Sequence, residues 1–187
     1  MADTDIQKVL NGDVDAYRFI VREHKDKAYT LAISVVKDEA LAQDVVQVAF
    51  IKAYKKLDTF KKESSFSTWF YRIVINEAFN KQKKEKKKPE ALDSVSPDAL
   101  IVEGIHTEFS KMDQNDQQHY INKALMRLPV NYSLALRLFY LNEFSLDEIT
   151  QITGWSNANT RVLLNRARKE IKNILTGLLN INKEDLY

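Results

Sequence analysis

Apolar residues recur at helical spacing along almost the whole chain, and this pattern limits the fold to an all-α class. The sequence holds only four glycines and three prolines, and no segment alternates polar and apolar residues for long enough to predict a strand. Breaker residues concentrate just after Lys88, where two prolines lie among serines and aspartates. We therefore expect two small helical domains joined by a flexible linker: residues 1–88, a linker over 89–112, and a second domain over 113–180.

In the first half, the spacing predicts four helices and one loop. We expect Asp13 to cap one helix and a second to contain residues 28–35. A third should begin at Asp38 and end near Leu57, before a polar loop over 58–65. The last should span 66–88.

The second half has clearer helix boundaries. We expect a helix over 114–127, and Pro129 suits the first turn of the next one. Ser145 and Glu148 form a capping-box pattern before a short helix that ends at Gly154. Ser156 can then cap a longer helix, whose inward residues are predicted to be Val162, Leu163, Ala167, Ile171 and Ile174. A short helix, a glycine turn and a longer helix with polar and basic residues at its start together predict a helix-turn-helix that binds DNA.

The segment 66–88 changes chemistry halfway. Aromatic residues crowd its first half, and six lysines opposed only by Glu85 lie between Lys81 and Lys88. Aromatic faces can stack on unpaired bases while lysines contact phosphates, so this pattern is typical of a site for melted nucleic acid. Aromatics that fill a core beside a solvated basic helix end would give the same pattern.

Composition and charge narrow the function further. A net charge of +2 conceals basic segments at 81–89 and 123–172 separated by an acidic one at 90–122. With no cysteine, the chain has no disulfide, thiolate nucleophile or cysteine-based zinc site. We find no apolar run near the roughly 18 residues of a membrane span and no signal-peptide pattern. We expect a cytoplasmic protein without a cofactor.

Four motifs resemble the extracytoplasmic-function (ECF) group of bacterial RNA polymerase sigma factors. Residues 42–50 (AQDVVQVAF) resemble that family's core-binding helix, A-E-D-x-x-Q-E-x-F. Residues 66–76 (FSTWFYRIVIN) resemble the segment that recognises the −10 promoter element. Residues 124–129 (ALMRLP) resemble the start of its second domain, and residues 159–168 (NTRVLLNRAR) resemble its −35 recognition helix.

The resemblance implies a sigma factor that binds core RNA polymerase and promoter DNA, is a monomer when free and contributes one copy to the holoenzyme. It also implies an anti-sigma partner and no direct insertion into the membrane. The predicted core-polymerase contacts are Leu41, Asp44, Val45, Gln47, Val48 and Ile51. The predicted −10 contacts are Phe60, Lys61, Lys62, Ser64, Ser65, Phe66, Thr68, Trp69, Tyr71, Arg72, Asn76, Asn80, Lys83 and Lys84. The predicted −35 contacts are Ser156, Asn157, Asn159, Thr160, Arg161, Asn165, Arg166 and Arg168.

The sequence departs from the family pattern at several positions. Gln43 and Val48 replace usual glutamates, Ser133 replaces a usual arginine, and Leu163 replaces a basic residue. These changes affect the expected promoter sequence and affinity more than the family assignment.

Three alternatives remain from the residues alone. A helix-turn-helix regulator that binds DNA by itself as a dimer would explain only residues 114–178. An enzyme is disfavoured because His24, His106 and His119 lie far apart in sequence, with no metal-ligand spacing and no nucleophile beside them. Membrane attachment through the lysines at 81–88 lacks an apolar anchor or a lipidation motif.

Overall fold

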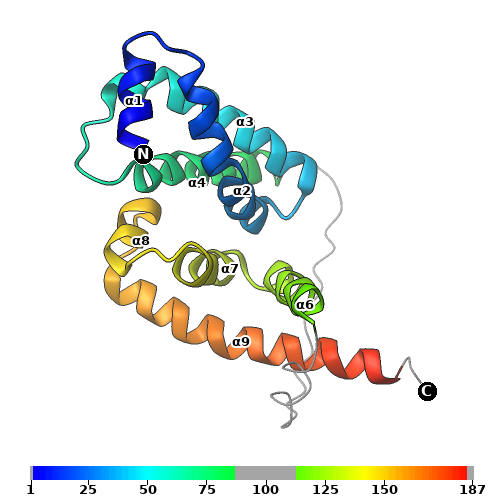
Figure 1. Ribbon diagram of the computed structural model, residues 1–187. Coiled ribbons are helices and arrows are strands. Elements are labelled where there is room, and N and C mark those ends of the chain that lie inside the picture. The colour runs from blue at the N-terminus through cyan, green and yellow to red at the C-terminus, as the bar shows by residue number, and fades with distance from the viewer. Residues whose placement is uncertain (1, 87–112, 185–187) are drawn as a thin grey trace.

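The computed structural model describes residues 2–86 and 113–184, and all its regular elements in those ranges are helical (Figure 1). The first domain contains α1 (Ala2–Leu10), α2 (Ala16–Val36), α3 (Glu39–Lys55), the short 3₁₀ turn η1 (Leu57–Thr59) and α4 (Phe66–Glu85). The second contains α6 (Gln114–Arg127), α7 (Val130–Leu136), the π-helical turn η2 (Arg137–Leu141), α8 (Leu146–Thr153) and α9 (Asn157–Glu184). The predicted linker, residues 89–112, lies outside the described residues.

Side-chain caps set several helix starts where the sequence predicted them. The Asp38 carboxylate accepts a hydrogen bond from the Leu41 amide at 2.8 Å, and the Ser65 hydroxyl accepts one from the Thr68 amide at 3.1 Å. Ser145 and Glu148 form the complete capping box of α8. Gly154 ends that helix in the left-handed conformation, with φ of 77°.

Two local predictions were wrong, and one helix was missed. Residues 16–36 form one helix instead of two, because no glycine or proline interrupts them. Helix α1, only nine residues long, was not predicted. Ala167 and Ile174 of α9 are buried as predicted, but Val162 is 46% exposed and the unpredicted Leu164 is buried in its place.

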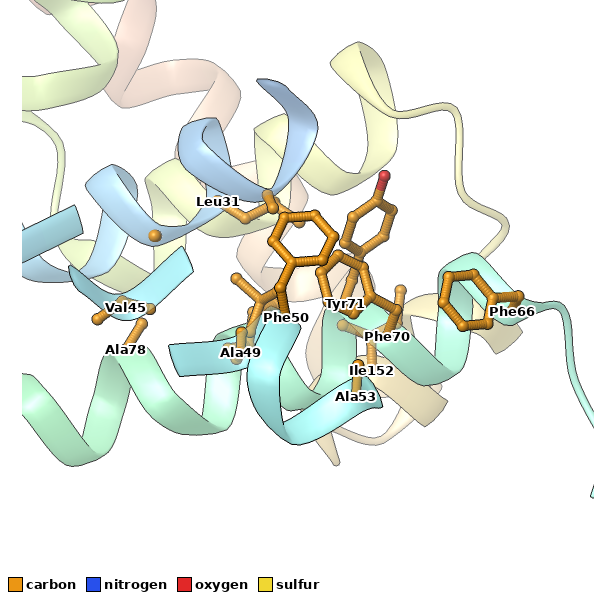
Figure 2. Packing of buried hydrophobic residues seen from close by; sticks show 14 of the residues in the cluster. Leu31, Val45, Ala49, Phe50, Ala53, Phe66, Phe70, Tyr71, Ala78 and Ile152 are labelled. Carbon is orange, nitrogen blue, oxygen red and sulfur yellow. The ribbon is translucent and has the colours of Figure 1, made fainter. Parts of the chain in front are cut away.

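The two domains pack against each other in two layers, with α7 and α8 of the second domain facing α2 and α4 of the first (Figure 1). Helix α9 lies on the side of the second domain that faces away from the first (Figure 1). One buried apolar cluster is shared by both layers, and Figure 2 shows Ile152 of α8 among side chains of α3 and α4. The helices that position the candidate sites therefore share a core across the domain boundary.

Candidate nucleic-acid and polymerase interfaces

A cavity of about 340 Å³ lies between the loop after η1 and the first turns of α4. Phe60 and Trp69 form an aromatic part of its wall, with ring centroids 5.3 Å apart. Lys61 and Arg72 add two cations and Glu63 adds one carboxylate, and all three side chains are exposed. This cavity can stack an unpaired base and bind its phosphate, which is the chemistry predicted for the −10 contacts. Gln151 of α8 also lines it, and no sequence signal pointed to that residue.

Three predicted −10 contacts are buried, so the expectation that these residues lie on the surface was wrong. Phe66 is 4%, Thr68 2% and Tyr71 1% exposed. Phe66 and Tyr71 point into the core, where aromatic area is buried most effectively. The Tyr71 hydroxyl lies 2.9 Å from Nδ1 of the buried His24. Thr68 helps to form the N-terminal cap of α4, its hydroxyl 2.8 Å from that of Ser65.

The remaining predicted −10 residues of α4 form an exposed stripe. Residues three or four positions apart share one face of a helix, and the stripe contains Arg72, Asn76, Asn80, Lys83 and Lys84, all exposed. In the preceding loop Lys61, Lys62 and Ser65 are exposed and Ser64 is partly buried. This polar and basic stripe runs from the cavity toward the end of the helix, so a single strand could follow it.

The predicted polymerase-binding face of α3 is mostly open to solvent. Asp44, Gln47, Val48 and Ile51 are exposed, with 41% and 49% exposure for the last two. Leu41 is partly buried. Val45 is only 3% exposed and packs in the core between α3 and α4, so the prediction that Val45 contacts polymerase was wrong.

A groove of about 250 Å³ runs beside this face, between α3 and α4. The Lys81 ammonium lies 3.3 Å from the Asp44 carboxylate, which joins the two helices across the groove. Lys52 and Glu77 form a second ion pair between the same helices, at 2.7 Å. The face thus combines exposed apolar side chains with charged groups at its edge, a composition suited to a protein partner.

Helices α8 and α9 form the predicted helix-turn-helix. All predicted −35 contacts are exposed except Thr160, which is fully buried. The Thr160 hydroxyl donates to the Ser156 carbonyl at 3.0 Å. The prediction that Thr160 contacts DNA was therefore wrong, and its hydroxyl instead stabilises the first turn of α9.

Two exposed residues of α9 are held by side chains that the sequence analysis missed. The Asn157 amide donates to Asp147 at 2.8 Å. The Arg168 Nε donates to the Tyr140 hydroxyl at 2.7 Å, and its guanidinium lies 5.6 Å from that ring's centroid. Both partners come from outside α9, so helical periodicity could not have identified them.

Two known families match the chain. The Sigma-70 region 2 family matches residues 20–88, and the Sigma-70, region 4 family matches residues 118–171. RNA polymerase sigma-H factor of Pseudomonas aeruginosa is 31% identical over 93% of both chains. The ECF RNA polymerase sigma factor SigW of Bacillus subtilis is 30% identical over 92% of this chain and 96% of its own. The chain belongs to the ECF family of RNA polymerase sigma factors.

Solved structures share the fold of this ECF sigma factor. CnrH in complex with the cytosolic domain of CnrY has a TM-score of 0.63 at 19% identity, covering 95% of this chain and 96% of that one. RpoE of Bartonella quintana, in complex with the anti-sigma factor NepR, has a TM-score of 0.65 at 22% identity, covering 87% and 98%. No helix within residues 2–86 or 113–184 is long and apolar enough to span a membrane.

Proposed function

We propose that this ECF sigma factor binds core RNA polymerase, recognises −10 and −35 promoter elements, and directs the initiation of transcription. The observation that supports it best is the pairing, in one chain, of an aromatic and cationic cavity on α4 with a helix-turn-helix in α8 and α9. A sigma factor needs both, because it holds duplex DNA at one element and melted DNA at the other. A DNA-binding regulator needs only the helix-turn-helix.

Each domain has a separate part in this proposal. Residues 1–88 bind polymerase through the exposed face of α3 and capture non-template bases in the α4 cavity. Unstacking a base costs a few kcal/mol, which stacking on Phe60 and Trp69 and binding of phosphate by Lys61 and Arg72 can offset. Residues 113–180 bind the −35 element through α9, and residues 89–112 tether the two domains. The chain acts without catalysis or a cofactor.

The partners in this proposal are core polymerase, promoter DNA and an anti-sigma factor, and the protein works in the cytoplasm. The chemistry of α3 supports the first of these, since Val48 and Ile51 leave apolar surface exposed beside Asp44 and Gln47. The exposed polar start of α9 supports the second, because asparagine and arginine can hydrogen-bond to base edges in the major groove.

Run-off transcription on sheared genomic DNA, with purified core polymerase and with or without this protein, tests the proposal. We expect new discrete start sites that depend on the protein. Tight binding to core with no new start sites would contradict a role in initiation. Absence of core binding together with tight binding to duplex DNA would favour a stand-alone regulator.

Single substitutions can then test the assigned faces. Asp44→Ala and Gln47→Ala should weaken binding to core by several-fold, because both side chains lie on the exposed face of α3 and neither is needed for the core of the domain. Glu23→Ala, on the exposed side of α2, is the matched control. Fluorescence titration with labelled core measures the affinity, and equal affinity for all three variants would contradict the assigned face.

The cations of the α4 cavity should act on melted DNA. Lys61→Ala and Arg72→Ala should each weaken open-complex formation and reduce the salt dependence of binding by about one counterion per lost phosphate contact. Lys25→Ala removes an exposed cation from α2 and serves as control. A salt slope unchanged in Lys61→Ala and Arg72→Ala would show that the cavity does not contact phosphates.

A further inference from the structure

Asn157, the first residue of α9, lies on the surface, but its side-chain amide is already engaged. The Nδ2 of Asn157 donates a hydrogen bond to Oδ1 of Asp147 in α8 at 2.8 Å. Its Oδ1 accepts one from the Thr150 hydroxyl at 3.3 Å, and that hydroxyl shares its single hydrogen with the Leu146 carbonyl at 2.9 Å. Because a carboxylate only accepts hydrogen bonds, the amide nitrogen of Asn157 has to face Asp147.

This engagement conflicts with a role of Asn157 in base readout. Asparagine recognises adenine in the major groove through its amide oxygen and its amide nitrogen together. In Asn157 each of these atoms already has a partner in α8. A base contact would have to turn the amide plane and break the bond to Asp147, which is among the stronger hydrogen bonds because its acceptor is charged.

Three other polar residues near the start of α9 are not engaged in this way. Asn159, Arg161 and Asn165 are exposed, and within the described residues none of their side chains forms a hydrogen bond or an ion pair. Arg161 and Asn165 lie four positions apart, so they share a face of the helix. These three side chains have free donors and acceptors for base edges, and other residues have to fix the helix that presents them.

A second contact holds α9 about three helical turns after Asn157. The Nε of Arg168 donates to the Tyr140 hydroxyl at 2.7 Å. The Tyr140 ring packs edge-on against Phe139, with centroids 5.0 Å apart, and Phe139 packs against both buried clusters. With α9 held at this point, loss of the Asn157 contact would act on the start of the helix, where the three free polar residues lie.

Small movements of the start of α9 are sufficient to disturb base readout. Side-chain tips lie about 5–6 Å from a helix axis, so a rotation of about 20° moves them by about 2 Å. Hydrogen bonds from N–H to oxygen require donor–acceptor distances of about 2.7–3.2 Å. A change in the orientation of α9 therefore weakens several base contacts together.

We propose that Asn157 is a positioning residue, which contacts no base itself. Its bond to Asp147 fixes the start of α9 to α8, in the orientation from which Asn159, Arg161 and Asn165 read the −35 element. This inference deepens the proposed function and rests on it. It reassigns one predicted −35 contact, and it gives Asp147 a part in promoter recognition although a carboxylate by its charge alone repels DNA.

The effect of removing Asp147 has opposite signs under the two explanations. By charge alone, Asp147→Ala should tighten binding to promoter DNA. Because the variant also loses the positioning bond, we expect holoenzyme that contains it to bind about three- to ten-fold more weakly. Fluorescence anisotropy at fixed salt, with a labelled promoter identified by run-off transcription, measures the affinity. Glu143→Gln removes another exposed carboxylate charge nearby in the chain and should not weaken binding. Binding by Asp147→Ala as tight as that of the wild type, or tighter, would overturn the inference.

A reciprocal exchange tests the pair itself. Asn157→Asp brings two carboxylates together, and their repulsion should lower promoter affinity by about ten-fold. Adding Asp147→Asn restores one donor and one acceptor at the wild-type net charge, so affinity should return to within about three-fold of the wild type. A base reader would not be rescued in this way, because a carboxylate cannot donate to a base. A double variant that binds no better than Asn157→Asp would contradict the positioning role.

Promoters in which one base pair of the −35 element is changed at a time complete the test. Arg161→Ala should lose discrimination at the base pairs that Arg161 reads, whereas Asn157→Ala should weaken discrimination at several positions together. Loss confined to one base pair in Asn157→Ala would identify Asn157 as a base reader and overturn the inference. Asn157→Ala introduces no repulsion, so this comparison holds even where Asn157→Asp fails to fold. Absence of dependent start sites with the wild-type protein would instead refute the proposed function, and the inference with it.

Discussion

His24 is a buried histidine with a polar contact on one side only. It is 6% exposed, its Nδ1 lies 2.9 Å from the Tyr71 hydroxyl, and its Nε2 has no partner among the described residues. Burial lowers the pKa of His24 below its usual value of 6.5. Burial also raises the pKa of the Tyr71 phenol, so Tyr71 stays neutral and can donate or accept.

The pKa of His24 predicts a loss of stability in acid. As pH falls, His24 is protonated in the unfolded chain before it is protonated in the folded protein. The stability that the neutral His24 contributes is therefore fully present above about pH 6.5 and is lost as pH falls toward the lower folded pKa. The free energy of unfolding should fall by up to about 1.4 kcal/mol per pH unit in that window. Urea unfolding at a series of pH values measures it. His24→Gln should flatten the slope, whereas His119→Gln, at an exposed site, should leave it unchanged.

At the scale of an element, the turn between α8 and α9 depends on one backbone conformation. Gly154 has φ of 77°, and an added Cβ there would meet nothing within 4 Å. The requirement for glycine is therefore conformational and not steric. Asparagine tolerates a positive φ, whereas β-branched residues do not. A comparison of asparagine with valine at position 154 can therefore separate the conformational cause from the steric one.

Gly154→Val should destabilise the protein by about 1–2 kcal/mol more than Gly154→Asn. The added strain reflects φ, since an added Cβ meets nothing within 4 Å. Thermal unfolding of the two variants measures the difference. Equal melting temperatures of the two variants would show that the turn can relax. We also expect Gly154→Val, as the more destabilised variant, to lose −35 binding.

At the scale of the whole molecule, Lys37 links pH to domain closure. Burial, and then the nearby Arg137 guanidinium, lower the pKa of Lys37 from 10.5 to about 8. Burial also lowers the pKa of Arg137 to about 10. Lys37 is partly buried and Arg137 is buried at the interdomain interface, so separation of the domains should return the pKa of Lys37 toward its usual value.

Closure should therefore increase as pH rises. Between about pH 8 and 10.5 the open form holds more protons on Lys37 than the closed form, so raising pH favours closure. Energy transfer between dyes on Asp26→Cys and Lys172→Cys, both exposed, follows the separation of the domains. Lys37→Met should remove the part of the pH response that Lys37 causes, and an unchanged response would assign it to other groups.

The sequence by itself determined the helical class, most of the helix boundaries and the helix-turn-helix. These features depend on local chemistry: Asp38, Ser65 and Ser145 cap helices through residues three positions away, and Gly154 ends one through its own backbone. Such signals lie within one turn of chain, so periodicity and residue type were sufficient. The exposed stripes of α3 and α4 were also predictable, because polar residues at helical spacing share a face.

Only the tertiary structure decided which members of those patterns reach the surface. A run of adjacent aromatics does not reveal which ring enters the core, so Phe66 and Tyr71 were assigned to DNA although they pack inside, while Trp69 lines the cavity. The contact between Thr68 and Glu148 joins positions 80 residues apart. Interdomain packing of that kind depends on the complementary shape of two folded surfaces, and no local pattern encodes it.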